Sequence, residues 1–69
     1  MSYKCEVHGI GDDGYTSNAL RFRTEQEALD YGSELSSRWF GIDGYRAALS
    51  DEPINYIFDY ALYKAVPIA

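Results

Sequence analysis

Polar and apolar residues alternate in four short stretches of the chain. Tyr3, Cys5 and Val7 are separated by polar side chains, the period-two pattern of a half-buried strand. The same period recurs over residues 20–22, 45–49 and 54–62. We therefore expect four strands. Residues 9–18 carry three glycines and two aspartates, which predicts a flexible loop between the first two strands.

Residues 24–39 instead have the period of a helix. Thr24 with Glu27 three residues later forms a capping box and predicts the start. At about 100° per residue the apolar face comprises Ala28, Gly32, Leu35 and Trp39. The opposite, solvent-facing side comprises Gln26, Glu27, Asp30, Ser33, Glu34 and Ser37. We expect Trp39 to be the main core anchor of the helix and Gly32 to allow close approach to the sheet.

The predicted order is β-β-α-β-β in a single domain, residues 1–69. This order favours an α+β fold, in which one helix packs on one face of an antiparallel sheet of three to four strands. The other face of the sheet is then open. On the last strand that open face comprises Asn55, Ile57, Asp59, Ala61 and Tyr63.

The charge balance limits the partners. Eleven Asp and Glu against six Lys and Arg give a net charge of -5, which repels phosphate backbones and anionic membranes. We expect a basic protein surface as partner, and neither direct nucleic-acid nor membrane binding. The single cysteine, Cys5, favours a reducing compartment, and neither terminus resembles a signal or membrane segment. These features predict a cytoplasmic protein, a monomer or weak homodimer.

No motif supports catalysis, a cofactor or a metal. The glycines at 9, 11 and 14 have the spacing of a dinucleotide-binding loop, but no helix follows and two carboxylates lie between them. Cys5 and His8 point to opposite faces of the first strand, so they form neither a nucleophile pair nor part of a zinc site. We expect Cys5 in the core, His8 at the surface, and no enzymatic activity.

Acidic residues are the best candidates for partner binding. Glu27, Asp30 and Glu34 are three and four residues apart, which predicts a single negative row along the helix. At 1.5 Å per residue they are spaced by about 4.5 and 6 Å, comparable to phosphates along a strand. The row is either a binding surface or an ordinary solvated face, on which Glu34 and Arg38 form an i,i+4 pair. The other candidates are the loop pairs Asp12, Asp13 and Asp51, Glu52.

Two resemblances add to this interpretation. The residues that carry the first are Asn18-Ala19-Leu20-Arg21-Phe22, Thr24, Glu27-Ala28, Tyr31, Ser37-Arg38-Trp39 and Asp51-Glu52-Pro53-Ile54-Asn55-Tyr56. They resemble a small group of uncharacterised bacterial and phage proteins of similar length, and this resemblance implies no activity. By type, a tiny acidic α+β protein is similar to phage anti-CRISPR proteins, especially those directed at type I effector complexes. That resemblance implies that carboxylates occupy a basic DNA-binding surface of the effector, in the host bacterial cytoplasm.

Three functional hypotheses follow. The first is a phage-type inhibitor that binds a basic nucleic-acid-binding surface by DNA mimicry. The second is a small bacterial protein that dimerises or binds a peptide through its open sheet face. The third is a weak RNA-binding module, because four arginines accompany seven tyrosines. Steep salt dependence favours the first hypothesis, and dimerisation without a partner favours the second.

Overall fold

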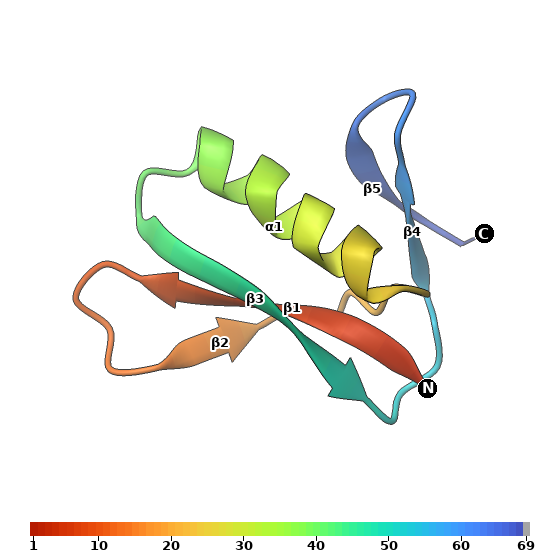
Figure 1. The fold of residues 1–69 in the computed structure, drawn as a ribbon, viewed down its shortest axis with the longest axis horizontal. Helices are drawn as coiled ribbons and strands as arrows, with labels where there is room; N and C mark the ends of the chain where they lie inside the picture. The colour runs from red at the N-terminus through yellow and green to blue at the C-terminus, as the bar shows by residue number, and fades with distance from the viewer. Residues whose placement is uncertain (69) are drawn as a thin grey trace.

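The protein has an α+β fold, in a computed structural model that describes residues 1–68. Its elements are β1 (Ser2–Gly9), β2 (Tyr15–Ser17), α1 (Glu25–Arg38), β3 (Ile42–Ser50), β4 (Tyr56–Asp59) and β5 (Lys64–Pro67). Strands β2, β1 and β3 form an antiparallel sheet in that order, and β4 and β5 pair separately. The helix packs on the three-stranded sheet (Figure 1), as the sequence pattern predicts.

Strand β1 is the centre of the sheet, and its alternation places side chains as expected. Cys5 is buried, with Tyr3 and Val7 packed around the same core. In the register with β3, Cys5 lies opposite Ala47 and Val7 opposite Tyr45. Because directly opposite residues share a face of an antiparallel pair, all five side chains lie on the helix side of the sheet.

The second strand differs from the expected one. Residues 15–17, predicted as loop, form β2, because Tyr15 and Thr16 suit a strand and Gly11, with a φ of 89°, allows the preceding turn. Residues 20–22, predicted as strand, make only one bridge, between Tyr3 and Phe22. Their alternation is nonetheless correct, since Phe22 is fully buried.

Local signals for the helix are confirmed. The Thr24 hydroxyl accepts a hydrogen bond from the Glu27 amide at 3.1 Å, so Thr24 is the N-cap. Gly32 lies against the sheet: a Cβ there would come within 2.6 Å of the Tyr45 ring and 2.8 Å of the Cys5 sulfur. A glycine is therefore required for the helix to approach β1 and β3 this closely.

Trp39 is not the core anchor. The helix ends at Arg38, and Trp39 is the C-cap with extended backbone angles, so its side chain reaches only the cavity that Cys5 and Leu35 also line. Its side chain is 56% exposed. The buried hydrophobic core consists of Cys5, Phe22, Ala28, Tyr31 and Phe58.

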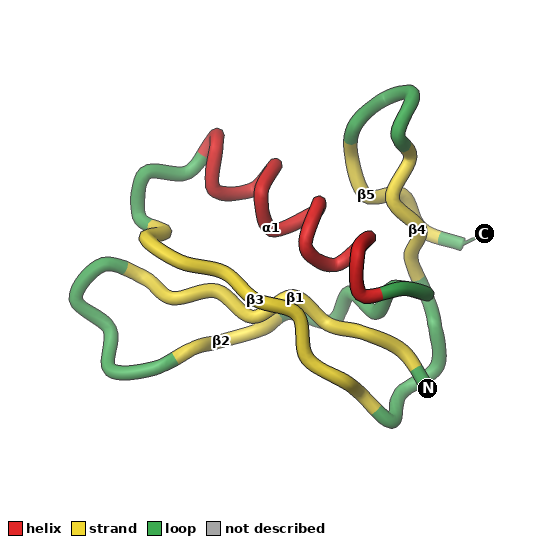
Figure 2. Tube along the Cα trace, viewed as in Figure 1, coloured by secondary structure: helices red, strands yellow, loops and turns green. Residues whose placement is uncertain are grey.

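The C-terminal segment is a hairpin rather than one long strand. Tyr60 to Tyr63 form a turn in which the Asp59 carboxylate accepts hydrogen bonds from the Ala61 and Leu62 amides, and Tyr63 has a φ of 52°. Such an Asx turn reverses the chain where alternation alone predicts continuation. The hairpin packs beside α1, apart from the main sheet (Figure 2), so the expected open face of a fourth strand in that sheet does not form.

Candidate functional site

Glu27, the first residue of the acidic row, is buried. Its side chain is covered by the β4–β5 hairpin, and only 5% of the residue is exposed. One carboxylate oxygen accepts a hydrogen bond from the Phe58 amide at 2.9 Å, and the other lies 3.4 Å from Arg23. The expectation that Glu27 faces solvent is therefore wrong, because it holds the hairpin against the helix.

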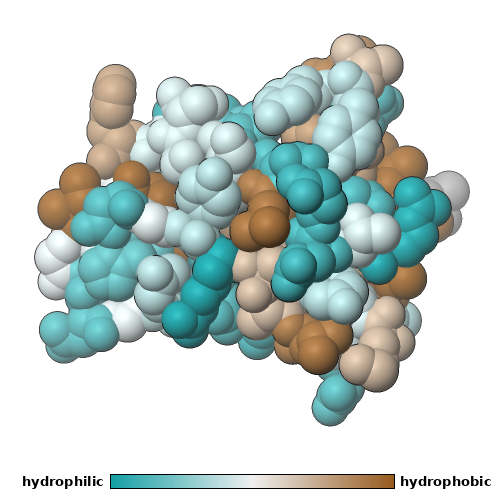
Figure 3. All heavy atoms as spheres, viewed as in Figure 1, coloured by the Kyte–Doolittle hydropathy of each residue, from teal (hydrophilic) through white to brown (hydrophobic). Residues whose placement is uncertain are grey.

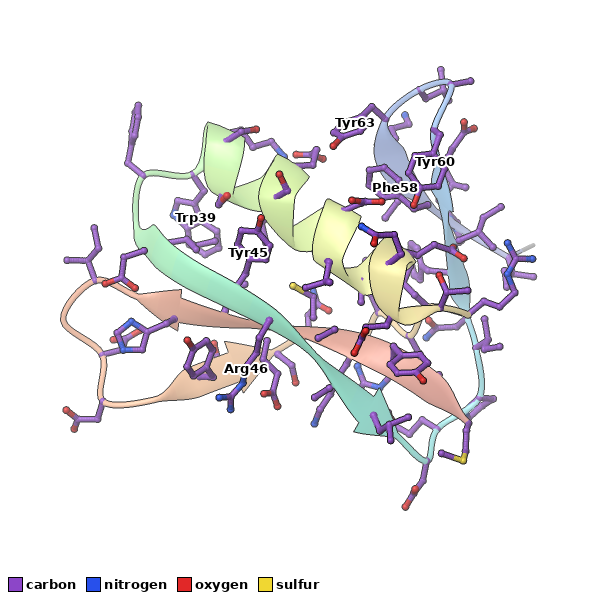
Figure 4. The ribbon with its side chains drawn as sticks, in the orientation of Figure 1. Trp39, Tyr45, Arg46, Phe58, Tyr60 and Tyr63 are labelled. Carbon is purple, nitrogen blue, oxygen red and sulfur yellow. The ribbon has the colours of Figure 1, made fainter. Side chains whose placement is uncertain are left out.

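Asp30 contacts the same hairpin. Its carboxylate accepts hydrogen bonds from the Tyr60 hydroxyl at 2.5 Å and from Gln26 at 2.9 Å. Hydrogen bonding to Asp30 raises the pKa of Tyr60 to about 12. Tyr60 and Tyr63 flank Phe58 beside the helix (Figure 4), with ring centroids 4.9 and 5.0 Å from that of Phe58. Asp30 thus fixes one edge of an aromatic cluster.

Glu34 completes the row and pairs with Arg38, as predicted for residues four apart. The ion pair raises the pKa of Arg38 further above its usual value. The three carboxylates of the row therefore all accept hydrogen bonds from the protein itself. This arrangement explains the row structurally: it joins α1 to the hairpin and stabilises the last turn of the helix.

The four loop acids lie in two other places. Asp12 and Asp13 are exposed in the turn between β1 and β2. Asp51 and Glu52 are exposed in the segment after β3, where Glu52 pairs with Arg21 at 2.6 Å. In Figure 1 this segment and the β1–β2 turn lie at opposite ends of the molecule. The seven acids predicted to bind a partner are thus in three separate places.

The β1–β2 turn lies beside the α1–β3 turn, and together they expose three hydrophobic side chains. The Ile10 amide donates to the Gly41 carbonyl at 2.8 Å and joins the two turns. Ile10 is 67% exposed, Trp39 56% and Phe40 95%. We call these three residues the apolar end. Hydrophobic surface is visible on this side of the molecule, at the left of Figure 3.

Three acidic residues lie in or next to the two turns of the apolar end. Asp12 and Asp13 follow Ile10 in the first turn, and Asp43 follows the second turn. The Asp43 carboxylate lies 2.6 Å from the His8 ring nitrogen, and this hydrogen bond raises the pKa of His8. Sequence reasoning missed the grouping, because Trp39 was assigned to the core and Ile10 to a flexible loop. The available signal was the run Trp39-Phe40-Gly41, which places two aromatic residues in a turn directly after the last helical turn.

The sheet face away from the helix is polar. The Arg46 guanidinium lies 3.9 Å above the Tyr15 ring and bonds Glu6 at 2.7 Å. Lys4 also pairs with Glu6, and the bond to Arg46 lowers the pKa of Glu6. The arginine and tyrosine that could stack a base thus already stack on each other. This face offers neither an apolar dimer surface nor a free aromatic platform.

Cys5 lines a small cavity. It has a volume of about 210 Å³ and lies between α1 and strands β1 and β2, lined in part by Cys5, Tyr31 and Leu35. Burial raises the pKa of the Cys5 thiol to about 11, so at neutral pH the thiol is protonated and a poor nucleophile. His8 is on the opposite face of β1, as expected, and gives Cys5 no base.

Within residues 1–68, no three His, Cys, Asp or Glu side chains are grouped as a metal site. No helix in this part of the chain has the length and apolar character to cross a membrane. Comparison with models of protein families, with curated proteins and with solved structures finds no match to this chain.

Proposed function

We propose that this protein is a non-enzymatic binding protein that docks on a basic surface of a larger protein. The observation that carries the proposal is the apolar end, where Ile10, Trp39 and Phe40 are exposed on two joined turns and Asp12 and Asp13 lie in the first of these turns. Exposed aromatic residues of this kind supply most of the binding energy in many interfaces. Surrounding carboxylates select a basic partner and speed its approach.

The proposed partner is a nucleic-acid-binding surface, as the resemblance to anti-CRISPR proteins implies. In that role the carboxylates at the apolar end take the place of DNA phosphates on a type I CRISPR effector. Asp12 and Asp13 are the best placed of the predicted acids, because both are exposed and lie in the same turn as Ile10. Asp30, Glu34, Asp51 and Glu52 add to the negative field, whereas Glu27 is buried and takes no part.

Inhibition of DNA binding tests the proposal directly. We expect the protein to displace a DNA duplex from a purified type I effector complex, measured by fluorescence anisotropy of labelled DNA. The effect should weaken as salt rises, since the Debye length falls from about 10 Å at 0.1 M to about 3 Å at 1 M. Unchanged DNA binding at saturating protein would contradict the effector as partner.

Matched variants locate the surface. Phe40→Ala should weaken binding at least tenfold, and Asp12→Asn with Asp13→Asn should weaken it and flatten its salt dependence. Controls at distant positions are Leu62→Ala, at a residue 62% exposed in the hairpin turn, and Asp51→Asn, which removes one charge of the field far from the apolar end and should have the smaller effect. The same comparison applies to any protein captured from a bacterial lysate. A partner that these control changes remove as readily as Phe40→Ala would exclude the apolar end as its binding site.

A further inference from the structure

The outer edge of β3 is unpaired. Among residues 1–68, β3 pairs only with β1, so the other side of this nine-residue strand presents main-chain donors and acceptors. Proteins usually protect such edges with proline, lysine or a bulge. β3 contains neither proline nor lysine, and its register irregularity lies at its start, opposite Gly9. Its two charged side chains, Asp43 and Arg46, bond His8 and Glu6 of β1. The edge is therefore free to pair with another strand.

Hydrophobic side chains lie along this edge on the helix side of the sheet. Tyr45, Ala47 and Leu49 share that side, because they lie opposite Val7, Cys5 and Tyr3. Tyr45 is 38% exposed and Leu49 58%. In an antiparallel pair of two identical strands centred on Ala47, the Tyr45 of each copy lies opposite the Leu49 of the other copy.

The flank of α1 above this edge carries no charged residue after Glu25. Gly32 contacts Tyr45 of β3, and at 100° per residue Leu29, Ser33 and Ser36 fall on the same flank. The acidic row lies on the other flank, where Glu27 and Asp30 contact the hairpin. These uncharged residues would therefore not repel the same flank of a second copy by charge.

We propose that two copies of this chain pair through their β3 edges, antiparallel, about a two-fold axis at Ala47. This register places Tyr45 opposite the partner's Leu49 and Arg46 opposite the partner's Ala48. An axis at Arg46 would place two arginines opposite each other, which is unfavourable. The dimer has one continuous sheet with both helices on the same face. It is independent of the proposed function, because the apolar end lies on the turns and not along this edge.

The oligomeric state tests the interface. We expect light scattering to show a mass that rises toward twice the 7.8 kDa of the chain across the micromolar range. Leu49→Lys should return the mass to that of one chain, because it puts a charge on the edge. Leu62→Lys, a matched change at a residue 62% exposed in the hairpin turn, should leave the dimer intact. A parent protein that stays at one chain's mass, or equal effects of the two variants, would overturn the proposal.

Cross-linking tests the register. Ala47→Cys should give a disulfide-linked dimer with oxidised glutathione, since residues at the axis of such a pair have Cα atoms about 4.5 to 5.5 Å apart. Cys5 lies opposite Ala47 within the chain, so both variants carry Cys5→Ala to prevent an internal disulfide. Ala48→Cys is the control, because its thiol faces the partner's Arg46 rather than its own copy. Linkage through position 48 in place of 47 would overturn the register, and linkage through neither would overturn the interface.

Discussion

Replacing Glu27 should destabilise the protein much more than replacing the neighbouring acid Glu25. Glu27→Ala removes the acceptor of the Phe58 amide, a hydrogen bond of 2.9 Å in the buried contact between α1 and the hairpin. A buried donor left without its acceptor costs about 1 to 3 kcal/mol. The same change removes the ion pair with Arg23. Because the Arg23 side chain is exposed, losing this pair costs only about a further 0.5 kcal/mol of stability. Glu25 is exposed, and Glu25→Ala loses only its favourable position near the helix N-terminus, about 0.5 kcal/mol.

Glu27→Gln separates the two contributions. The amide oxygen still accepts from Phe58, but hydrogen bonds to a charged group are roughly twice as strong as neutral ones. We expect a loss of about 1 kcal/mol, intermediate between the parent and the alanine variant. From the sequence, neutralising Glu27, Asp30 and Glu34 together relieves repulsion and leaves folding intact. Because Glu27 is buried and bonded, we now expect this triple change to lower the free energy of unfolding.

Thermal unfolding followed by far-ultraviolet circular dichroism measures these differences. Fluorescence is less suitable, because the single tryptophan is 56% exposed in the folded protein. For a domain of this size 1 kcal/mol shifts the midpoint by roughly 4 to 8 °C, so Glu27→Ala should lower it by about 10 °C. A midpoint for Glu27→Ala equal to that of Glu25→Ala would refute the role of Glu27 as the link to the hairpin.

Four further changes test other parts of the structure. Thr24→Ala should cost about 1 kcal/mol in urea unfolding and Thr24→Ser almost nothing; equal losses would argue against the hydroxyl cap. Gly32→Ala should cost about 1 to 3 kcal/mol despite the better helix propensity of Ala, because a Cβ would come within 2.6 Å of a ring carbon on β3; a stabilised variant would contradict this contact. Trp39→Ala should lower the melting temperature by only a few degrees, since a half-exposed side chain loses little burial; a collapse of the fold would restore the core assignment. The raised pKa of His8 implies stabilisation that is fully present below pH 6.5 and is lost as pH rises through the higher folded pKa, so Asp43→Asn should lower the melting temperature more at pH 5.5 than at pH 8; an equal effect at both would exclude this linkage.

Features set by local sequence could be predicted. Thr24 caps the helix through atoms only three residues away, and the alternation around Cys5 places the first strand correctly. The third strand was also correct, although β3 extends beyond the predicted 45–49 at both ends. The α+β arrangement then follows, because one amphipathic helix needs one apolar sheet face to cover.

Features set by contacts between residues far apart in the sequence could not be predicted. The burial of Glu27 depends on its contact with Phe58, thirty-one residues later in the chain. No residue near Glu27 in the sequence indicates that a hairpin covers it. Alternation over residues 54–62 looks continuous, yet the Asp59 side chain reverses the chain. For the candidate site, composition predicted an acidic surface, but the two distant turns are brought together by the pairing of β1 with β3 and by the contact between Ile10 and Gly41.

The attachment of the β4–β5 hairpin has a consequence for motion. Among the described residues the hairpin forms no ladder with the three-stranded sheet. It is held by Phe58 in the core, by Glu27 and Asp30 of α1, and by the main-chain amides of Asn55 and Tyr56, which donate to the Arg21 carbonyl. A segment joined in this way can open as a unit while the rest of the protein stays folded. Opening exposes Phe58 together with Glu27, so hydrogen exchange of the Phe58 amide reports the detachment of the hairpin rather than global unfolding.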